Sequence, residues 1–239
     1  MTQATPDAAA DRLRAALQHA DGSERVRSAL AAGTYPRGSY VRVLVDRCAA
    51  EPDFTVRETL TWALTRQDRD LTLAALLPEL RSPVAQARSQ ALHTLSKLGD
   101  ERAWPEITPA LLDDADPDVA KTAWRAASGL APDRDRPALA DALATHLGRG
   151  EPDLRRSLSR AFVALGADAE AAVDRAARST EWEVRMHALA TAHLLENPED
   201  SFETAVAEAR RTSARRDAAG WDDGARSDRA SGDGPPPAR

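Results

Sequence analysis

The chain has 239 residues, with 42% hydrophobic, 4% aromatic and 29% charged side chains and a net charge of −6. Alanine and leucine supply most of the apolar surface, which argues against a β-sandwich and favours helices packed on helices. The acidic balance argues against an extended phosphate-binding surface, and a single cysteine, Cys48, excludes an intramolecular disulfide or a multi-cysteine metal site.

The first 22 residues carry charges where a signal peptide needs an apolar run. Leu13 and Leu17 fall on one face, so residues 1–22 are expected to provide a capping helix at the N-terminal end of the fold. The longest uncharged run, residues 186–195, is ten residues long, whereas a bilayer-spanning helix needs about 18 or more. We therefore expect a cytoplasmic protein with no membrane partner.

A repeat occupies residues 23–214. With Arg88 as the reference position, its equivalents are Arg57, Ala120, Arg155 and Arg185, at spacings of 31, 32, 35 and 30 residues. Small or apolar residues stand one position before and three and seven positions after each of them, as on one face of a helix. A second, less regular apolar helix follows each of these first helices. Residues 23–51 look like a degenerate first copy.

Prolines mark where these helices begin. They stand near the start of four first helices, at Pro52, Pro83, Pro117 and Pro152. Pro78 and Pro109 each lie 21 residues after a reference arginine and predict a kink or the start of a helix. A helix pair of this size must stack on its neighbours to bury its apolar face. The pattern predicts an all-α fold, a right-handed α-solenoid of stacked antiparallel helix pairs with about six repeats.

Residues 215–239 are rich in Gly, Pro, Ser and Asp and lack apolar periodicity, which predicts a disordered polar tail. Trp221 in this tail is either a docking anchor or, in the favoured interpretation, a stray aromatic residue. The expected domains are a capping helix at 1–22, the repeat solenoid at 23–214 and the tail at 215–239. The preference for arginine over lysine indicates a bacterial-like, high-GC composition.

The stretches "PDFTVRETLTWAL", "AQARSQALHTLSKLG" and "WEVRMHALATAHLL" carry one further signal. Their shared pattern resembles the HEAT repeat family, with its armadillo-like stacking, and in particular the short HEAT-like repeats of the phycobilisome-lyase type. The resemblance implies that the recurring arginines tie adjacent repeats together, so it assigns a structural role to Arg57, Arg88, Arg155 and Arg185. Ala120 departs from the pattern and forgoes that bond.

The resemblance also brings enzymes into consideration, because several use this type of scaffold. Deoxyhypusine hydroxylases bind iron through His-Glu dipeptides, but none of the five histidines here precedes a glutamate. No zinc motif, phosphate loop or nucleophile elbow occurs. The sequence therefore predicts no catalytic residue, no metal ligand and no cofactor, and it favours a non-enzymatic protein. A lyase-like enzyme or enzyme accessory that acts on a small ligand or a protein modification is the alternative.

Two surfaces are candidates for binding a partner. The second helices carry mixed charges rich in aspartate, which would suit a partner with basic groups. Five positions after the reference residues, on the outward face of the first helices, stand Trp62, His93, Arg125, Arg160 and Ala190, and the first four are the candidate binding residues. This row is typical of binding hot spots, although packing of Trp62 under the N-terminal helices and solubilising arginines are the favoured interpretation. We predict a monomeric scaffold or adaptor for protein–protein interaction, with nucleic-acid binding as a second alternative.

Overall fold

A computed structural model describes residues 7–215 of the chain, and within this range all regular secondary structure is helical. The helices of the N-terminal half are α1 (Ala8–Ala16), α2 (Gly22–Thr34), α3 (Tyr40–Ala50), α4 (Phe54–Thr65), α5 (Arg69–Leu76), the 3-10 helix η1 (Leu77–Arg81) and α6 (Ala85–Leu98). They are followed by η2 (Glu101–Glu106), α7 (Pro109–Leu112), α8 (Pro117–Leu130), η3 (Asp133–Asp135), α9 (Arg136–Ala144), α10 (Pro152–Leu165), α11 (Ala167–Ala176), α12 (Trp182–Glu196) and a helix at 202–215. The all-α fold predicted from the repeat is confirmed.

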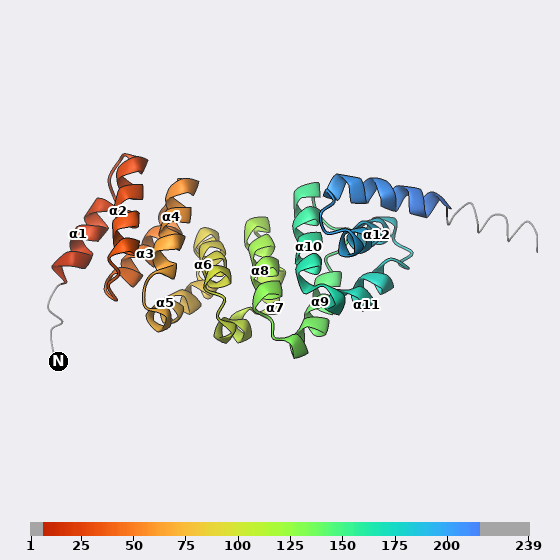
Figure 1. The fold of residues 1–239 in the computed structure, drawn as a ribbon, viewed down its shortest axis with the longest axis horizontal. Coiled ribbons are helices and arrows are strands. Elements are labelled where there is room, and N and C mark those ends of the chain that lie inside the picture. Colours follow the sequence, from red (N-terminus) through yellow and green to blue (C-terminus); the bar gives the residue numbers. More distant parts are fainter. Residues whose placement is uncertain (1–6, 216–239) are drawn as a thin grey trace, which may run out of the picture. The chain divides into compact units, whose positions relative to one another are not determined.

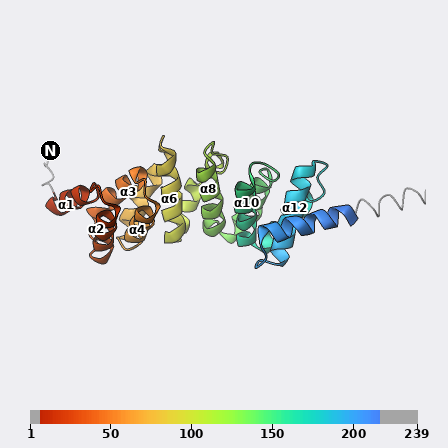
Figure 2. The ribbon, with the colours of Figure 1, turned by 90° about the horizontal axis from the view of Figure 1, so that it is seen from above.

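The chain divides into two compact units between Leu143 and Ala144. In the first unit, α2, α4, α6 and α8 lie side by side, each in contact with the next (Figures 1 and 2). A second layer of α1, α3, α5 and η1 packs against them, and η2 and α7 pack on α8. The first helices of the predicted repeats therefore form one layer of this unit, and the shorter second helices form the other.

Side chains at the helix starts explain where these helices begin. Asp53 caps α4 by accepting hydrogen bonds from the backbone N–H groups of Thr55 and Val56, and Asp116 caps α8 in the same way. Two of the predicted prolines also mark helix starts, because Pro117 and Pro152 are the first residues of α8 and α10. Pro78 and Pro109 each lie in the first turn of a new short helix, so the helix-start alternative is confirmed at both positions.

The predicted apolar face of the first helices is buried in the first unit. On α4 it comprises Val56, Leu60 and Leu64, on α6 Ala87, Ala91 and Leu95, and on α8 Val119, Ala123 and Ala127. Thr61 and Thr94 face each other across α4 and α6 with their hydroxyl oxygens 3.5 Å apart. The small side chains at these two positions let α4 and α6 approach closely.

The second unit consists of the end of α9, α10, α11, α12 and the helix at 202–215, with α12 in contact with both α10 and α11. Here the buried face of α12 is wider than the repeat pattern predicts. Ala190, which the pattern places outward, is fully buried, and so are His187 and Thr191. The His187 ring packs edge-on against Phe202, with ring centroids 5.9 Å apart, so the helix at 202–215 covers a side of α12 that the other first helices leave free.

Two expectations about the ends of the chain have different outcomes. A helix at Ala8–Ala16 with Leu13 and Leu17 buried occupies the place of the predicted N-terminal capping helix. The predicted tail falls almost wholly outside the described residues, apart from Arg215 at the end of the last helix. Among residues 7–215, none of the helices has the length and hydropathy that a bilayer crossing requires.

Candidate interaction surfaces

The recurring arginines bind the loops that precede their own helices. Each stands four residues after the N-cap residue of its helix, and its guanidinium donates hydrogen bonds to backbone carbonyls five or six residues earlier in the chain. Arg57 binds the carbonyls of Glu51 and Pro52, at 3.0 and 2.8 Å, and Arg185 binds those of Ser179 and Thr180, at 2.7 and 3.2 Å. Arg88 and Arg155 each bind one such carbonyl, of Ser82 and Gly150 respectively.

Some of these arginines also reach the next repeat. Arg88 makes a two-pronged ion pair with Asp114, with N–O distances of 2.8 and 2.9 Å, and Arg155 reaches Glu183 at 2.7 Å. The hydrogen bonds from Arg88 hold the pKa of Asp114 below its ordinary value. Arg88 and Arg155 thus bond to the following repeat, whereas the hydrogen bonds of Arg57 and Arg185 within residues 7–215 go to the loops before their own helices.

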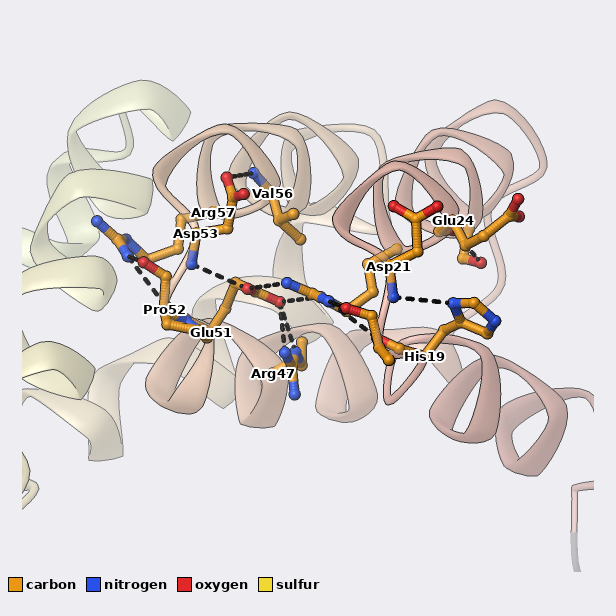
Figure 3. A network of polar contacts seen from close by, with 12 residues as sticks. His19, Asp21, Glu24, Arg47, Glu51, Pro52, Asp53, Val56 and Arg57 are labelled. Carbon is orange, nitrogen blue, oxygen red and sulfur yellow. Dashed lines mark hydrogen bonds and ion pairs between the residues drawn. The ribbon is translucent and has the colours of Figure 1, made fainter.

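A fifth arginine, Arg25, makes the same set of bonds. It binds the carbonyls of His19 and Ala20 and pairs with both oxygens of Glu51, each at 2.8 Å. Glu51 is fully buried and also accepts hydrogen bonds from Arg47 and from the Asp53 N–H (Figure 3). Burial raises the pKa of Glu51, but the hydrogen bonds from Arg25, Asp53 and Arg47 outweigh it and hold this pKa below its ordinary value.

Arg57 lacks the acidic partner that Arg25 and Arg88 have. Their partners, Glu51 and Asp114, both stand two residues before an N-cap and accept its N–H. The equivalent position before α6 is Ser82, whose hydroxyl accepts the N–H of the N-cap residue but carries no charge. As a result, Nε of Arg57 is buried without a hydrogen-bond partner within the described part of the chain.

The outward row lies on α4, α6 and α8 of the first unit, with Arg160 exposed on α10 of the second unit. Trp62 is 40% exposed even though its ring packs closely against Gly33 of α2. The guanidinium of Arg66, one turn further along α4, lies 6.0 Å from the Trp62 ring centroid. The structure therefore combines the two sequence interpretations of Trp62, since the ring is packed on one side and open on the other.

His93 connects this row into a polar chain. Its Nδ1 lies 3.0 Å from the Arg125 guanidinium, and its Nε2 lies 3.0 Å from a carboxylate oxygen of Glu58, without the alignment of a hydrogen bond. Burial lowers the pKa of His93, and the nearby charges of Arg125 and Lys97 act in the same direction against that of Glu58. We call Trp62, Arg66, His93, Lys97 and Arg125 the first-helix row. The sequence pattern missed Arg66 and Lys97, although both stand nine residues after a reference arginine.

The second unit contains a groove between α12 and the helix at 202–215. It has a volume of about 420 Å³, and Trp182, Met186, Phe202 and Val206 form its apolar part. Trp182 is 50% exposed, and the Arg185 guanidinium lies 5.3 Å from its ring centroid. Arg210 lies on the rim and forms no ion pair with any residue of the range 7–215. Sequence patterns did not identify this groove, because the repeat pattern does not specify how far apart the two helices of the last repeat lie.

His187 lies beside this groove, but its ring atoms are engaged in the fold. Its Nδ1 accepts the Gly148 N–H at 3.0 Å, and its Nε2 donates to the carbonyl of Arg155 at 3.0 Å. The hydroxyl of Ser159 lies 3.1 Å from Nε2 and 2.8 Å from that of Thr191. Burial lowers the pKa of His187 to about 4, so the ring is neutral at pH 7.

Two further features concern reactive chemistry. Cys48 is buried, and burial raises the pKa of its thiol to about 12, as suits a small apolar side chain rather than a nucleophile. In the described range, no group of three or more His, Cys, Asp or Glu side chains has an arrangement that could hold a metal ion.

Comparisons with known proteins give structural similarities of low TM-score. No family model matches the chain, and no curated protein matches its sequence. Two engineered proteins solved by the Northeast Structural Genomics Consortium match with a TM-score of 0.44 at 18% and 14% identity, covering 79% of this chain and 97% and 98% of theirs. The complex of CpcE and CpcF of phycocyanin lyase from Nostoc sp. PCC7120 matches with a TM-score of 0.37 at 19% identity, covering 89% of this chain and 96% of that one. Because these TM-scores lie below 0.5, the fold class rests on the helices described above.

Proposed function

We propose that this chain is a non-enzymatic helical-repeat scaffold that binds a protein partner through the first-helix row. The partner segment has an apolar anchor residue flanked by carboxylates. One observation carries this proposal. A half-exposed tryptophan, Trp62, shares the row with three cations, Arg66, Lys97 and Arg125, and none of the three has a carboxylate partner among residues 7–215. Aromatic and arginine side chains dominate the energetics of protein interfaces.

Two acidic residues in the loops that flank the second helices are already engaged within the fold. Asp114 is paired with Arg88, and Asp100 is paired with both Arg69 and Arg102. The side chains of Asp114 and Asp100 are only 10% and 7% exposed. These carboxylates therefore stabilise the fold through their ion pairs and are not accessible to a basic partner. Arg66, Lys97 and Arg125 outnumber Glu58, the carboxylate that lies 3.0 Å from His93, so the row carries an excess of positive charge, which supports an acidic partner segment.

A protein partner suits the row better than a nucleic acid. Binding to a phosphate backbone draws on many cations along one stripe, whereas the row offers three, next to the apolar Trp62 and the exposed Leu30 of α2. The whole chain carries a net charge of −6, which repels a polyanion. An aromatic anchor with a few surrounding cations matches a short acidic peptide instead.

Selection from a displayed library of random peptides tests the proposal without a known partner. The full chain is the bait, and the variant Lys97→Glu/Arg125→Glu is used for counter-selection. We expect enriched peptides to contain an aromatic or leucine residue next to Asp or Glu, and to lose binding to Trp62→Ala. The matched control is Phe54→Ala, which removes another exposed aromatic residue from the same helix.

Two outcomes would count against the proposal. Enriched peptides that are basic, or that bind Trp62→Ala as well as the unmodified chain, would remove the row from the interface. Salt-dependent retention of the chain on duplex DNA, lost in Lys97→Glu/Arg125→Glu, would assign the row to nucleic acid instead.

A further inference from the structure

The groove in the second unit exposes apolar side chains that a folded protein normally covers. Trp182 is 50% exposed, and Met186, Phe202 and Val206 continue its apolar surface along a hollow of about 420 Å³. Leaving such surface in water costs about 25 cal/mol for each Å². Grooves of this volume with an apolar lining and a few charged groups at the rim are typical binding sites.

The helix that forms one wall of the groove leads directly into the segment 216–239. Val206 and Arg210 line the groove, and this helix extends to Arg215. The nine residues from Val206 to Arg215 span about 14 Å of helix. Trp221 stands six residues after Arg215, and six extended residues span up to about 20 Å. Chain length therefore allows Trp221 to return to the groove beside Val206.

The chemistry of the segment also matches the groove. Trp221 is the sole aromatic residue of 216–239, and it is followed at once by Asp222 and Asp223. Arg210 is exposed on the rim without an ion-pair partner in the range 7–215. An indole in the apolar part of the groove would place the two carboxylates near this guanidinium, where they gain a charge-assisted hydrogen bond.

We propose that the segment 216–239 occupies this groove within the same molecule, with Trp221 in the apolar part and Asp222 and Asp223 at Arg210. A short tether holds the ligand at an effective concentration of the order of millimolar, so even a weak site is filled. This inference is independent of the proposed function, which concerns the first unit.

Fluorine NMR of the full chain labelled with 5-fluorotryptophan tests this proposal. The chain has five tryptophans, and Trp221→Phe identifies the resonance of Trp221. We expect this resonance to lie away from that of free 5-fluorotryptophan and to relax as fast as those of the buried tryptophans. Val206→Glu, which places a charge in the groove, should move it to the free position.

A pair of charge variants provides the matched control. Asp222→Lys/Asp223→Lys should release Trp221, whereas Asp228→Lys/Asp233→Lys makes the same change in net charge further along the segment and should leave its resonance in place. Equal effects of the two pairs, no response to Val206→Glu, or a free-like Trp221 in the unmodified chain would each overturn the proposal. A resonance that shifts with protein concentration would assign the groove to the segment of a second copy and overturn it as well.

Discussion

Ser82 departs from the pattern in which an acidic residue before the next first helix pairs with the recurring arginine, and this leaves Arg57 without such a partner. Ser82→Asp places a carboxylate at the position equivalent to Glu51 and Asp114, the acidic partners of Arg25 and Arg88, and Nε of Arg57 has no hydrogen-bond partner within residues 7–215. We expect the free energy of unfolding to rise by about 1 kcal/mol, because a half-buried guanidinium gains a charged hydrogen bond. Urea titration monitored by circular dichroism measures this change.

A double-mutant cycle separates this bond from a general effect of the new charge. The carboxylate of Ser82→Asp also lies near the N-terminus of α6, where any negative charge is favoured. In an Arg57→Met background, only that smaller contribution should remain. A gain of the same size with and without Arg57 would show that the two side chains do not interact.

His187 makes the stability of the protein depend on pH. Its pKa is 6.5 in the unfolded chain and about 4 in the folded one. Between these two pH values the unfolded state binds a proton at this ring and the native state does not, so the free energy of unfolding falls as the pH falls. The contribution of neutral His187 to the free energy of unfolding is present in full above pH 6.5 and is lost progressively as the pH falls toward 4. Between pH 6.5 and 5, we expect a loss of about 2 kcal/mol.

Unfolding measured at several pH values in the unmodified chain and in His187→Gln isolates this contribution. The variant lacks the titrating ring, so its free energy of unfolding should fall less steeply over the same range. If both proteins lose stability in parallel, the buried histidine is not the group responsible.

The reference arginines show how far single residues can be interpreted from sequence. Their recurrence predicts a structural role, and their carbonyl bonds support it. Arg25 was not among the reference residues because Glu24 and Ser28 stand at positions that are apolar in the other copies. Two signals were nevertheless present, since Arg25 precedes Arg57 by 32 residues and Ala32 keeps the apolar position seven residues after it. The missing partner of Arg57 depends on which loop faces it, and sequence spacing does not give that information.

At the scale of helices, the close packing of α2 on α4 depends on one glycine. A Cβ atom at Gly33 would lie 2.3 Å from Cζ3 of Trp62 and 3.0 Å from the backbone Cα of Ala63. Gly33→Ala should therefore force the two helices apart and destabilise the protein by about 1–3 kcal/mol, despite the better helix propensity of alanine. Thermal unfolding and the fluorescence of Trp62 report the change.

Gly129 on α8 provides the matched control, because a Cβ atom there has nothing within 4 Å. Gly129→Ala should raise stability by about 0.5–1 kcal/mol through helix propensity alone. Destabilisation of equal size at both glycines would mean that the contact with Trp62 is not the cause.

The helices themselves were well specified by sequence. The apolar positions of α4, α6 and α8 are buried as predicted, and two prolines open the short helices that the spacing indicated. α12 was less predictable, because Phe202 of the following helix covers its outward side. The groove beside it lies between α12 and the second helix of the same repeat, and the spacing of apolar residues does not give the distance between these two helices.

For the whole molecule, the net charge of −6 does not show how the paired and unpaired charges are distributed over the surface. Asp100, Asp114 and Glu51 are engaged in ion pairs at loops between helices, whereas the cations of the first-helix row have no carboxylate partner in the described range. The composition therefore argues against a nucleic-acid partner, while the first-helix row carries a local excess of positive charge that the net charge does not reveal. The sequence placed Trp62, His93 and Arg125 on one outward face. The contacts of Trp62 with Gly33, and of His93 with Glu58 and Arg125, could be identified only from the structure.

The affinity of an enriched acidic peptide for the full chain, measured by fluorescence anisotropy at about 0.05 M and about 0.3 M NaCl, tests the central claim most directly. We predict that Trp62→Ala and Arg125→Glu each weaken binding about tenfold or more, equivalent to about 1.4 kcal/mol, and that affinity falls at the higher salt concentration. Arg134→Glu, at an arginine whose side chain is 82% exposed in the same unit, should leave affinity unchanged. Equal affinity for all three variants and the unmodified chain would contradict the claim that the first-helix row is the binding surface.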